Sequence, residues 1–239
     1  MKNNFQLPTN TSAMNREHMS VAFAIDTSSS VSLTALHNIN TCLNRFKSIV
    51  CSDERAARCV DVAVVTFADS TKVVLDWCPI MEMPSIDLER GCLTDLNGGV
   101  LQAATMIREQ SKRYNAAGII EKKPYLIVMT DGMDTVTSSV NEAANYVVPR
   151  ERDGKLKVFF LGVDDYDREC AAQLTQGAGS MVFEIRDDTY DFSDFFDFAA
   201  NSTKAASVSA VGEAIIVDTP IAKGESKIEA VNLSEWLNN

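Results

Sequence analysis

The sequence is poor in histidine, has no paired cysteines and contains no long apolar run. Only His18 and His37 are present among 239 residues, and the six cysteines occur without a C-x-x-C pair. This pattern disfavours a zinc site or a disulfide framework and predicts reduced thiols in the core of a cytoplasmic protein. No apolar run reaches membrane-spanning length, and residues 1–20 lack the apolar core of a secretory signal. We therefore expect no membrane partner.

Basic residues are fewer than acidic ones. The chain has 22 Lys and Arg residues against 33 Asp and Glu, which gives a formal net charge of −11. Nucleic acids and anionic membrane surfaces repel such a chain, so we expect neither as a partner. The sequence has no G-x-x-x-x-G-K-[ST] phosphate loop and no G-x-S-x-G elbow, and Gly98 and Gly99 lie in a helical pattern. These absences favour a protein that is not an enzyme.

Short apolar segments alternate with helical patterns from about residue 20 onward. The run at 21–25 has no polar alternation, which is typical of a strand buried on both faces of a parallel sheet. The sequence predicts six strands, at residues 21–26, 62–67, 72–77, 125–129, 156–163 and 181–185. Because only four residues separate the second and third, these two should form an antiparallel hairpin with the third at the sheet edge. The expected fold is α/β, a doubly wound (Rossmann-like), mostly parallel sheet with one antiparallel edge strand and helices on both faces.

The helices have recognisable starts and ends. An amphipathic helix that includes Leu33 should begin just past Ser30, and Asp95 should open the next helix. Ser139 and Glu142 have the spacing of a capping box, and Gly177 is expected to end a short helix. A final helix should start at Asp191 and place four phenylalanines in the core, namely Phe192, Phe195, Phe196 and Phe198.

The chain divides into a domain and two terminal segments. Residues 1–19 are polar and are predicted to be a flexible lead-in, whereas residues 20–206 should form the domain. Residues 207–239 form a tail with a β-prone piece at 215–217 and a terminal helical turn that carries Leu233, Trp236 and Leu237. This tail either packs on its own domain or serves as an interaction segment, and the sequence leaves both open.

A cluster of polar side chains follows the first predicted strand. Asp26, Ser28 and Ser30 alternate directly after it, where open α/β sheets bind ligands. The predicted strand at 125–129 leads into Asp131 in the same way. The two carboxylates should therefore face each other across the crevice at the carboxyl ends of these strands. Two nearby carboxylates repel, and a divalent cation removes that penalty. Oxygen ligands suit Mg²⁺, Mn²⁺ or Ca²⁺.

Two further features bear on this site. Gly91 lets the 90–95 loop approach closely, and Thr94 in that loop can direct its hydroxyl toward the carboxylates. The alternative is that Asp26 and the serines only cap the following helix. Asp134 is interpreted as a turn residue, with support of the metal ligands as its alternative role.

The three pieces together carry a resemblance. Asp26-x-Ser28-x-Ser30, Thr94 in a glycine-containing loop, and Thr130-Asp131-Gly132 resemble the metal-ion-dependent adhesion site (MIDAS) of von Willebrand factor A domains over residues 18–205. The resemblance implies that the three hydroxyls bind the cation, that both aspartates bind it directly or through water, and that one position stays open for a carboxylate of a partner protein. Mg²⁺ is the expected ion. Cys92 departs from the family's pattern, because many members have a glycine there.

The resemblance extends to a narrower group and to a function. The chain is similar to compact bacterial proteins of the TerY/YegL type, which are associated with tellurite resistance and stress response. We therefore expect a metal-dependent protein-interaction module, with operon-encoded kinase- or phosphatase-like proteins among its partners. The alternative is a Mg²⁺-dependent hydrolase or phosphotransfer enzyme, since a metal beside Asp26 could activate water or hold phosphate. A scaffold with a vestigial site is a third possibility.

Overall fold

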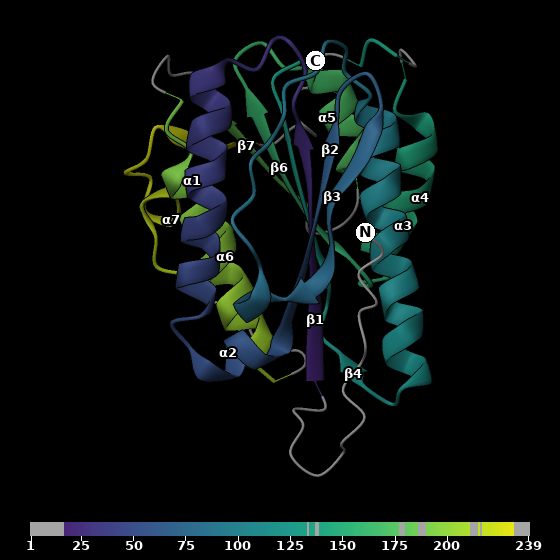
Figure 1. Cartoon of the computed structure of the whole chain (residues 1–239), viewed down its shortest axis with the longest axis vertical. Coiled ribbons are helices and arrows are strands. Elements are labelled where there is room, and N and C mark those ends of the chain that lie inside the picture. Colours follow the sequence, from purple (N-terminus) through teal and green to yellow (C-terminus); the bar gives the residue numbers. More distant parts are fainter. Residues whose placement is uncertain are drawn as a thin grey trace.

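The computed structural model describes residues 17–132, 134–136, 139–176, 180–185, 190–210, 215 and 217–231. A central sheet has the strand order β3-β2-β1-β5-β6-β7-β8, and β4 pairs with the start of β1 (Figure 1). The strands are β1 Glu17–Asp26, β2 Val60–Phe67, β3 Thr71–Pro79, β4 Ile120–Glu121, β5 Tyr125–Thr130, β6 Lys157–Val163, β7 Met181–Ile185 and β8 Ile228–Val231. The sheet is parallel from β2 to β7 and antiparallel at both edges.

The predicted α/β class is confirmed, and the predicted number of strands is corrected from six to eight in the described part of the chain. The hairpin of β2 and β3 lies at one edge, as predicted. The sequence prediction missed β4 because two residues give no pattern. It missed β8 because that strand alternates weakly, with Ile228 buried and Glu229 and Ala230 exposed.

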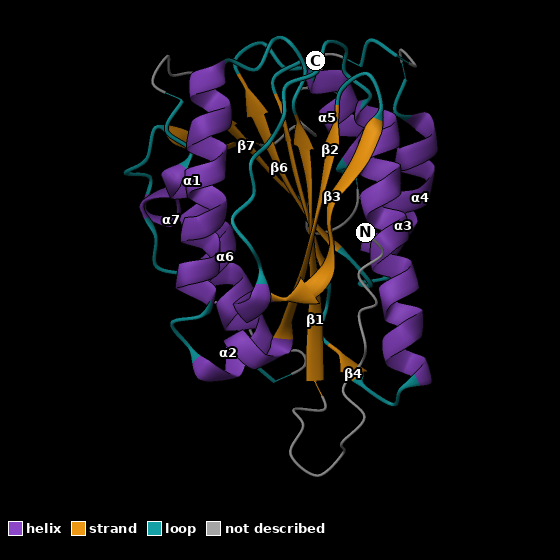
Figure 2. Ribbon diagram, in the orientation of Figure 1, coloured by secondary structure: helices purple, strands orange, loops and turns teal. Residues whose placement is uncertain are grey.

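Helices cover both faces of the sheet (Figure 2). One face packs against α1 Leu33–Val50, α2 Glu54–Cys59 and α6 Ser193–Val208, and the other against α3 Leu96–Ala116, α4 Asn141–Arg152 and α5 Arg168–Leu174. The short elements η1 Ile80–Glu82 and α7 Pro220–Lys223 complete the described chain. The apolar run of β1 is unbroken because both faces of the strand are buried. Phe23 and Ile25 enter one core, and Ala22 and Ala24 enter the other.

Most of the predicted helix features are present, with local differences. Asp95 caps α3 by accepting from the backbone N–H of Gly98. Leu33 is 70% exposed and so lies outside the buried face of α1, which includes Leu36 and Ile39. Helix α4 begins after Val140 and continues through Pro149, so the predicted capping box does not form its start. Gly177 lies outside the described residues.

The final helix forms the aromatic side of the core. Asp191 accepts from the N–H of Ser193, and α6 begins at that serine, two residues later than predicted. All four phenylalanines are buried, as predicted. Phe196 stacks on Phe23 of β1 with ring centroids 6.0 Å apart. The helix is therefore anchored against the strand that leads into Asp26.

The described part of the tail packs on the domain. Strand β8 pairs antiparallel with β7, and Thr219 caps the short helix α7. Ile215 and Val217 are not in a strand, and Leu233, Trp236 and Leu237 lie outside the described residues. Among the helices of the described chain, none combines the length and the hydropathy needed to cross a membrane.

Candidate metal site

Asp26 and Asp131 lie at the carboxyl ends of neighbouring parallel strands. The register pairs Ile25 with Met129, so Asp26 ends β1 next to Thr130, and Asp131 follows β5 directly. The Asp26 carboxylate accepts from the Ser28 N–H at 2.8 Å and from the Thr130 hydroxyl at 2.6 Å. Asp26 is almost completely buried, so these two bonds fix its orientation. The sequence analysis placed the two carboxylates together correctly but missed the role of Thr130.

A chain of hydroxyl contacts joins the two strand ends. The Ser28 and Ser30 hydroxyl oxygens are 2.8 Å apart, and the Ser30 hydroxyl donates to Asp131 Oδ1 at 2.8 Å. Ser28 is buried, Ser30 is exposed, and Asp131 is partly exposed. Their oxygens therefore converge on one place at the surface, beyond the carboxyl ends of β1 and β5, as the alternating spacing predicts. Ser29 points elsewhere, because its hydroxyl donates to the Cys92 carbonyl at 2.7 Å.

Thr94 reaches the same place from the loop before α3. A Cβ atom built on Gly132 would lie 3.5 Å from Thr94 Oγ1 and 3.6 Å from Ser30 Oγ, so both hydroxyls border the space beside this glycine. Thr94 is buried, and its backbone exchanges two bonds with Thr135: its N–H donates to the Thr135 hydroxyl and its carbonyl accepts the Thr135 N–H, both at 2.9 Å. All five predicted ligands thus belong to one cluster.

The 90–95 loop is held close to the strand ends. The Gly91 N–H donates to the Thr27 carbonyl at 2.7 Å, and a Cβ on Gly91 would lie only 2.4 Å from the Ala68 Cβ. This is the close backbone approach that the sequence predicts for Gly91. Cys92 is exposed, and its backbone carries the contacts, with its N–H donating to Asp69 Oδ2 at 2.8 Å.

Asp134 serves as a turn residue that also contacts the first turn of α3. Its carboxylate accepts from the Val136 N–H at 3.0 Å and from the Asn97 N–H at 2.9 Å. The Asn97 side chain in turn accepts from the Ala143 N–H at 3.0 Å. The sequence analysis missed Asn97, because nothing in a helical pattern marks a side chain that reaches the next helix.

The two carboxylates of the site have unfavourable electrostatics. Burial raises the pKa of Asp26, although hydrogen bonds from Thr130 and Ser28 oppose the shift. Burial, together with the negative charge of Asp26, raises the pKa of Asp131 to about 6. Both shifts reflect the cost of burying a negative charge, and for Asp131 also the repulsion between the two carboxylates. The described residues contain no cluster of three His, Cys, Asp or Glu side chains that could hold a metal ion. The cluster at the strand ends instead offers two carboxylates and three hydroxyls. Such a donor set fits a hard divalent cation.

The family model of the von Willebrand factor type A domain matches residues 20–198 of the chain. The chain belongs to this family. The match covers every residue of the cluster, and the family's fold agrees with the mostly parallel sheet between two helical layers. A search of curated proteins found no match.

Solved structures share this fold at low sequence identity. The pilus adhesin SpaC from Lactobacillus rhamnosus GG is 12% identical with a TM-score of 0.60, covering 79% of this chain and 30% of its own. A von Willebrand factor type A protein from Catenulispora acidiphila is 15% identical with a TM-score of 0.55, covering 79% and 43%. Proximal thread matrix protein 1 from the mussel byssus, solved with a zinc-occupied MIDAS motif, is 16% identical with a TM-score of 0.52, covering 79% and 48%. The chain thus spans less than half the length of these three proteins.

Proposed function

We propose that this domain binds a divalent cation through Asp26, Ser28, Ser30, Thr94 and Asp131, and that it uses this cation to bind an acidic side chain of a partner protein. Mg²⁺ is the expected ion, with Mn²⁺ and Ca²⁺ as alternatives. The observation that carries the proposal is the convergence of these residues, in which a hydroxyl chain joins two carboxylates of raised pKa.

The make-up of the cluster favours an external anionic ligand. Three of the five proposed ligands are neutral hydroxyls, so a bound divalent cation keeps more positive charge than it would among carboxylates alone. Ser30 is exposed and Asp131 is partly exposed, so the site opens to the surface. The residues of this chain therefore hold the ion and leave one side of it to a carboxylate from outside.

The surroundings of the site suit a protein partner. Three large apolar side chains are exposed on the segments that carry the ligands: Leu33 at 70%, Leu93 at 48% and Val136 at 45%. Arg90 in the same loop as Leu93 donates to the Ser29 carbonyl. Exposed apolar residues beside a charged anchor are typical of a protein-interaction surface. We expect the partner to present an Asp or Glu flanked by apolar side chains.

The mussel protein of the same fold supports the choice of a metal site, because it was solved with a zinc-occupied MIDAS motif. The finer parts of the proposal rest on the sequence resemblance: a TerY/YegL-like protein of a bacterial stress-response or tellurite-resistance system, acting in the cytoplasm with a kinase- or phosphatase-like partner. We propose no enzymatic role. A hydrolase would show metal-dependent turnover that Asp26→Asn abolishes.

Calorimetric titration with Mg²⁺ and Mn²⁺ tests the metal site. We expect one ion per chain, and at least tenfold weaker binding for Ser28→Ala and Ser30→Ala. Ser29→Ala is the matched control, because its hydroxyl bonds to Cys92 rather than to the cluster. Equal affinity in all four proteins would overturn the assignment of the ligands.

The interaction is tested with the same proteins. Wild-type and Asp26→Ala baits are used to capture partners in Mg²⁺ and in EDTA. A partner that is retained only by the wild type in Mg²⁺ supports a metal-bridged contact. Partners that bind under all four conditions would show that another surface makes the contact.

A further inference from the structure

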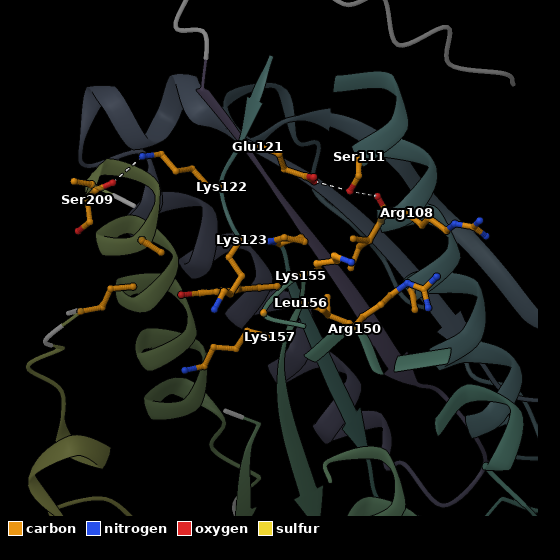
Figure 3. A pocket seen from close by; sticks show the side chains of 18 residues that line it. Arg108, Ser111, Glu121, Lys122, Lys123, Arg150, Lys155, Leu156, Lys157 and Ser209 are labelled. Atoms are coloured by element: carbon orange, nitrogen blue, oxygen red, sulfur yellow. Dashed lines mark hydrogen bonds between the residues drawn. The ribbon is translucent and has the colours of Figure 1, made fainter. Parts of the chain in front are cut away.

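A second cavity lies at the end of the sheet opposite the candidate metal site. It has a volume of about 740 Å³ and opens between the middle of α3, the segment that leads into β5, the turn between α4 and β6, and the end of α6 (Figure 3). This volume lies within the range of small-molecule sites, about 300–1,000 Å³. Asp26 ends β1 and Asp131 directly follows β5, whereas Tyr125 and Lys157, which line this cavity, begin β5 and β6.

Positive charge is concentrated around this cavity. Six of the chain's 22 basic residues line it, against the single carboxylate of Glu121. The six are Arg108, Lys122, Lys123, Arg150, Lys155 and Lys157. Figure 3 shows Arg108 and Arg150 on the side of the cavity nearer α3, and Lys122 and Lys157 on the side nearer α6. In a chain with a net charge of −11, such a concentration marks a local field that attracts anions.

Some of these cations already have partners. Lys122 donates to the Ser209 carbonyl at 2.7 Å and lies 3.3 Å from a Glu17 carboxylate oxygen. Lys155 pairs with Asp153 at 2.9 Å. Arg150 donates to the Tyr146 carbonyl and stacks over the ring of the same tyrosine. Arg150 also lies in the last turn of α4, where a cation complements the helix dipole.

Lys123 and Lys157 are different. Neither is in a helix, and neither forms an ion pair with a carboxylate of the described residues, although the Lys157 ammonium lies 5.2 Å from the centroid of the Phe159 ring. Burial and the charge of Lys123 lower the pKa of Lys157, while Glu151 opposes the shift. The carboxylate of Glu121 accepts from the Ser111 hydroxyl at 2.8 Å, and burial raises its pKa. A bound anion between these two lysines would relieve their mutual repulsion.

The rest of the lining is mostly apolar, with Ser111 and Ser209 as its polar side chains. Its buried apolar residues are Ala104 and Ile107 of α3, Tyr125 at the start of β5 and Leu156 before β6, and its more exposed ones are Ala206, Ala210 and Ile215. A simple inorganic anion would leave this surface unused. A ligand with a flat or apolar body would cover it, while its anionic end meets the lysines.

We propose that this basic pocket binds a small molecule in which phosphate groups are attached to an aromatic or apolar body, the chemistry of a nucleoside diphosphate. Lys123 and Lys157 contact the phosphates, and the more exposed apolar residues of the lining, Ala206, Ala210 and Ile215, contact the body. The pocket shares no residue with the candidate metal site.

The test is calorimetric titration of the full chain with ADP, pyrophosphate and adenosine in low-salt buffer with EDTA, which keeps divalent cations out of the other site. We expect one ADP per chain, with pyrophosphate and adenosine each binding at least tenfold more weakly than ADP. Lys123→Met and Lys157→Met should each lower the ADP affinity at least tenfold. Both variants should unfold at or above the wild-type temperature, since each removes one of two mutually repelling charges.

Two variants serve as controls. Lys112→Met removes the same charge from the exposed face of α3, where Lys112 pairs with Glu109, and should change the affinity less than twofold. Asp26→Ala should bind ADP as the wild type does. The proposal is overturned if ADP does not bind, if the three lysine variants lose affinity equally, or if Asp26→Ala abolishes binding. Binding of a polyglutamate peptide in place of ADP would also overturn it, because the pocket would then belong to a protein partner.

Discussion

Replacement of Asp131 with asparagine should stabilise the metal-free protein while it weakens metal binding. The pKa of Asp131 is raised to about 6 by burial and by the charge of Asp26, so its ionised form is less favourable in the fold than in the unfolded chain. Asparagine keeps the size of the side chain, and its oxygen can still accept the hydrogen bond from Ser30. The substitution therefore removes the charge and little else.

The magnitude follows from the pKa. A rise of about two pKa units corresponds to about 3 kcal/mol, and solvent screening of this partly exposed carboxylate reduces the expected gain to about 1–2 kcal/mol at pH 7. Because the folded pKa lies above the unfolded value of 3.8, the folded state holds its proton more tightly. The wild type therefore loses stability relative to Asp131→Asn as the pH rises from about 4 to about 6, and the difference stays constant above that.

Urea unfolding in EDTA at several pH values measures this difference. Asp87→Asn is the control, because Asp87 is exposed and its carboxylate accepts from the Asn40 side chain rather than from a residue of the cluster. In saturating Mg²⁺ the order should reverse, since ligand binding stabilises only the protein that holds the ion. The reasoning fails if Asp131→Asn is less stable than the wild type in EDTA, or if the difference does not change between pH 4 and pH 6.

The remaining predictions concern the core, the loops and the partner surface. Phe196→Ala should destabilise the fold by about 3–5 kcal/mol in chemical unfolding, because it empties a fully buried position beside Phe23; a loss below 1 kcal/mol would contradict the packing described. Gly99→Ala should destabilise by about 1–3 kcal/mol, since its Cβ would lie 2.3 Å from a ring atom of Phe67; an unchanged midpoint would show that the ring moves freely. Leu33→Ser should leave the unfolding midpoint within the error of the wild type and weaken partner capture in Mg²⁺, because this side chain is 70% exposed; unchanged capture would place the partner elsewhere.

The sequence predicts the fold well where one residue pattern determines one element. The unbroken apolar run before Asp26 identifies a strand covered on both faces, and the structure places its alternate residues in two separate cores. The four-residue link between the second and third predicted strands correctly indicates an antiparallel edge hairpin. Strand β8 could not be predicted, because it is defined by its pairing with β7 rather than by a residue pattern of its own.

The candidate site, like the fold, could be predicted only in part from the sequence. Asp26, Ser28, Ser30, Thr94 and Asp131 could be named from their positions after strands and before a helix, and the structure brings them together. Their supporting contacts depend on tertiary structure that no local pattern reveals: the Thr130 hydroxyl on Asp26, and Asn97 between Asp134 and α4. The basic pocket could not be predicted from the sequence either, because its cations come from separate segments between residues 108 and 157.

The central claim is that five residues beyond the carboxyl ends of the central strands hold a divalent cation, with a position left for an external carboxylate. Crystals grown with Mn²⁺ test it most directly, because anomalous diffraction locates the ion without assumptions about its ligands. The account predicts one peak within coordination distance of the Ser28 and Ser30 hydroxyls, with a solvent molecule or a carboxylate from another molecule on its open side. A fully occupied Mn²⁺ peak elsewhere on the chain, with none between Asp26 and Asp131, would contradict it.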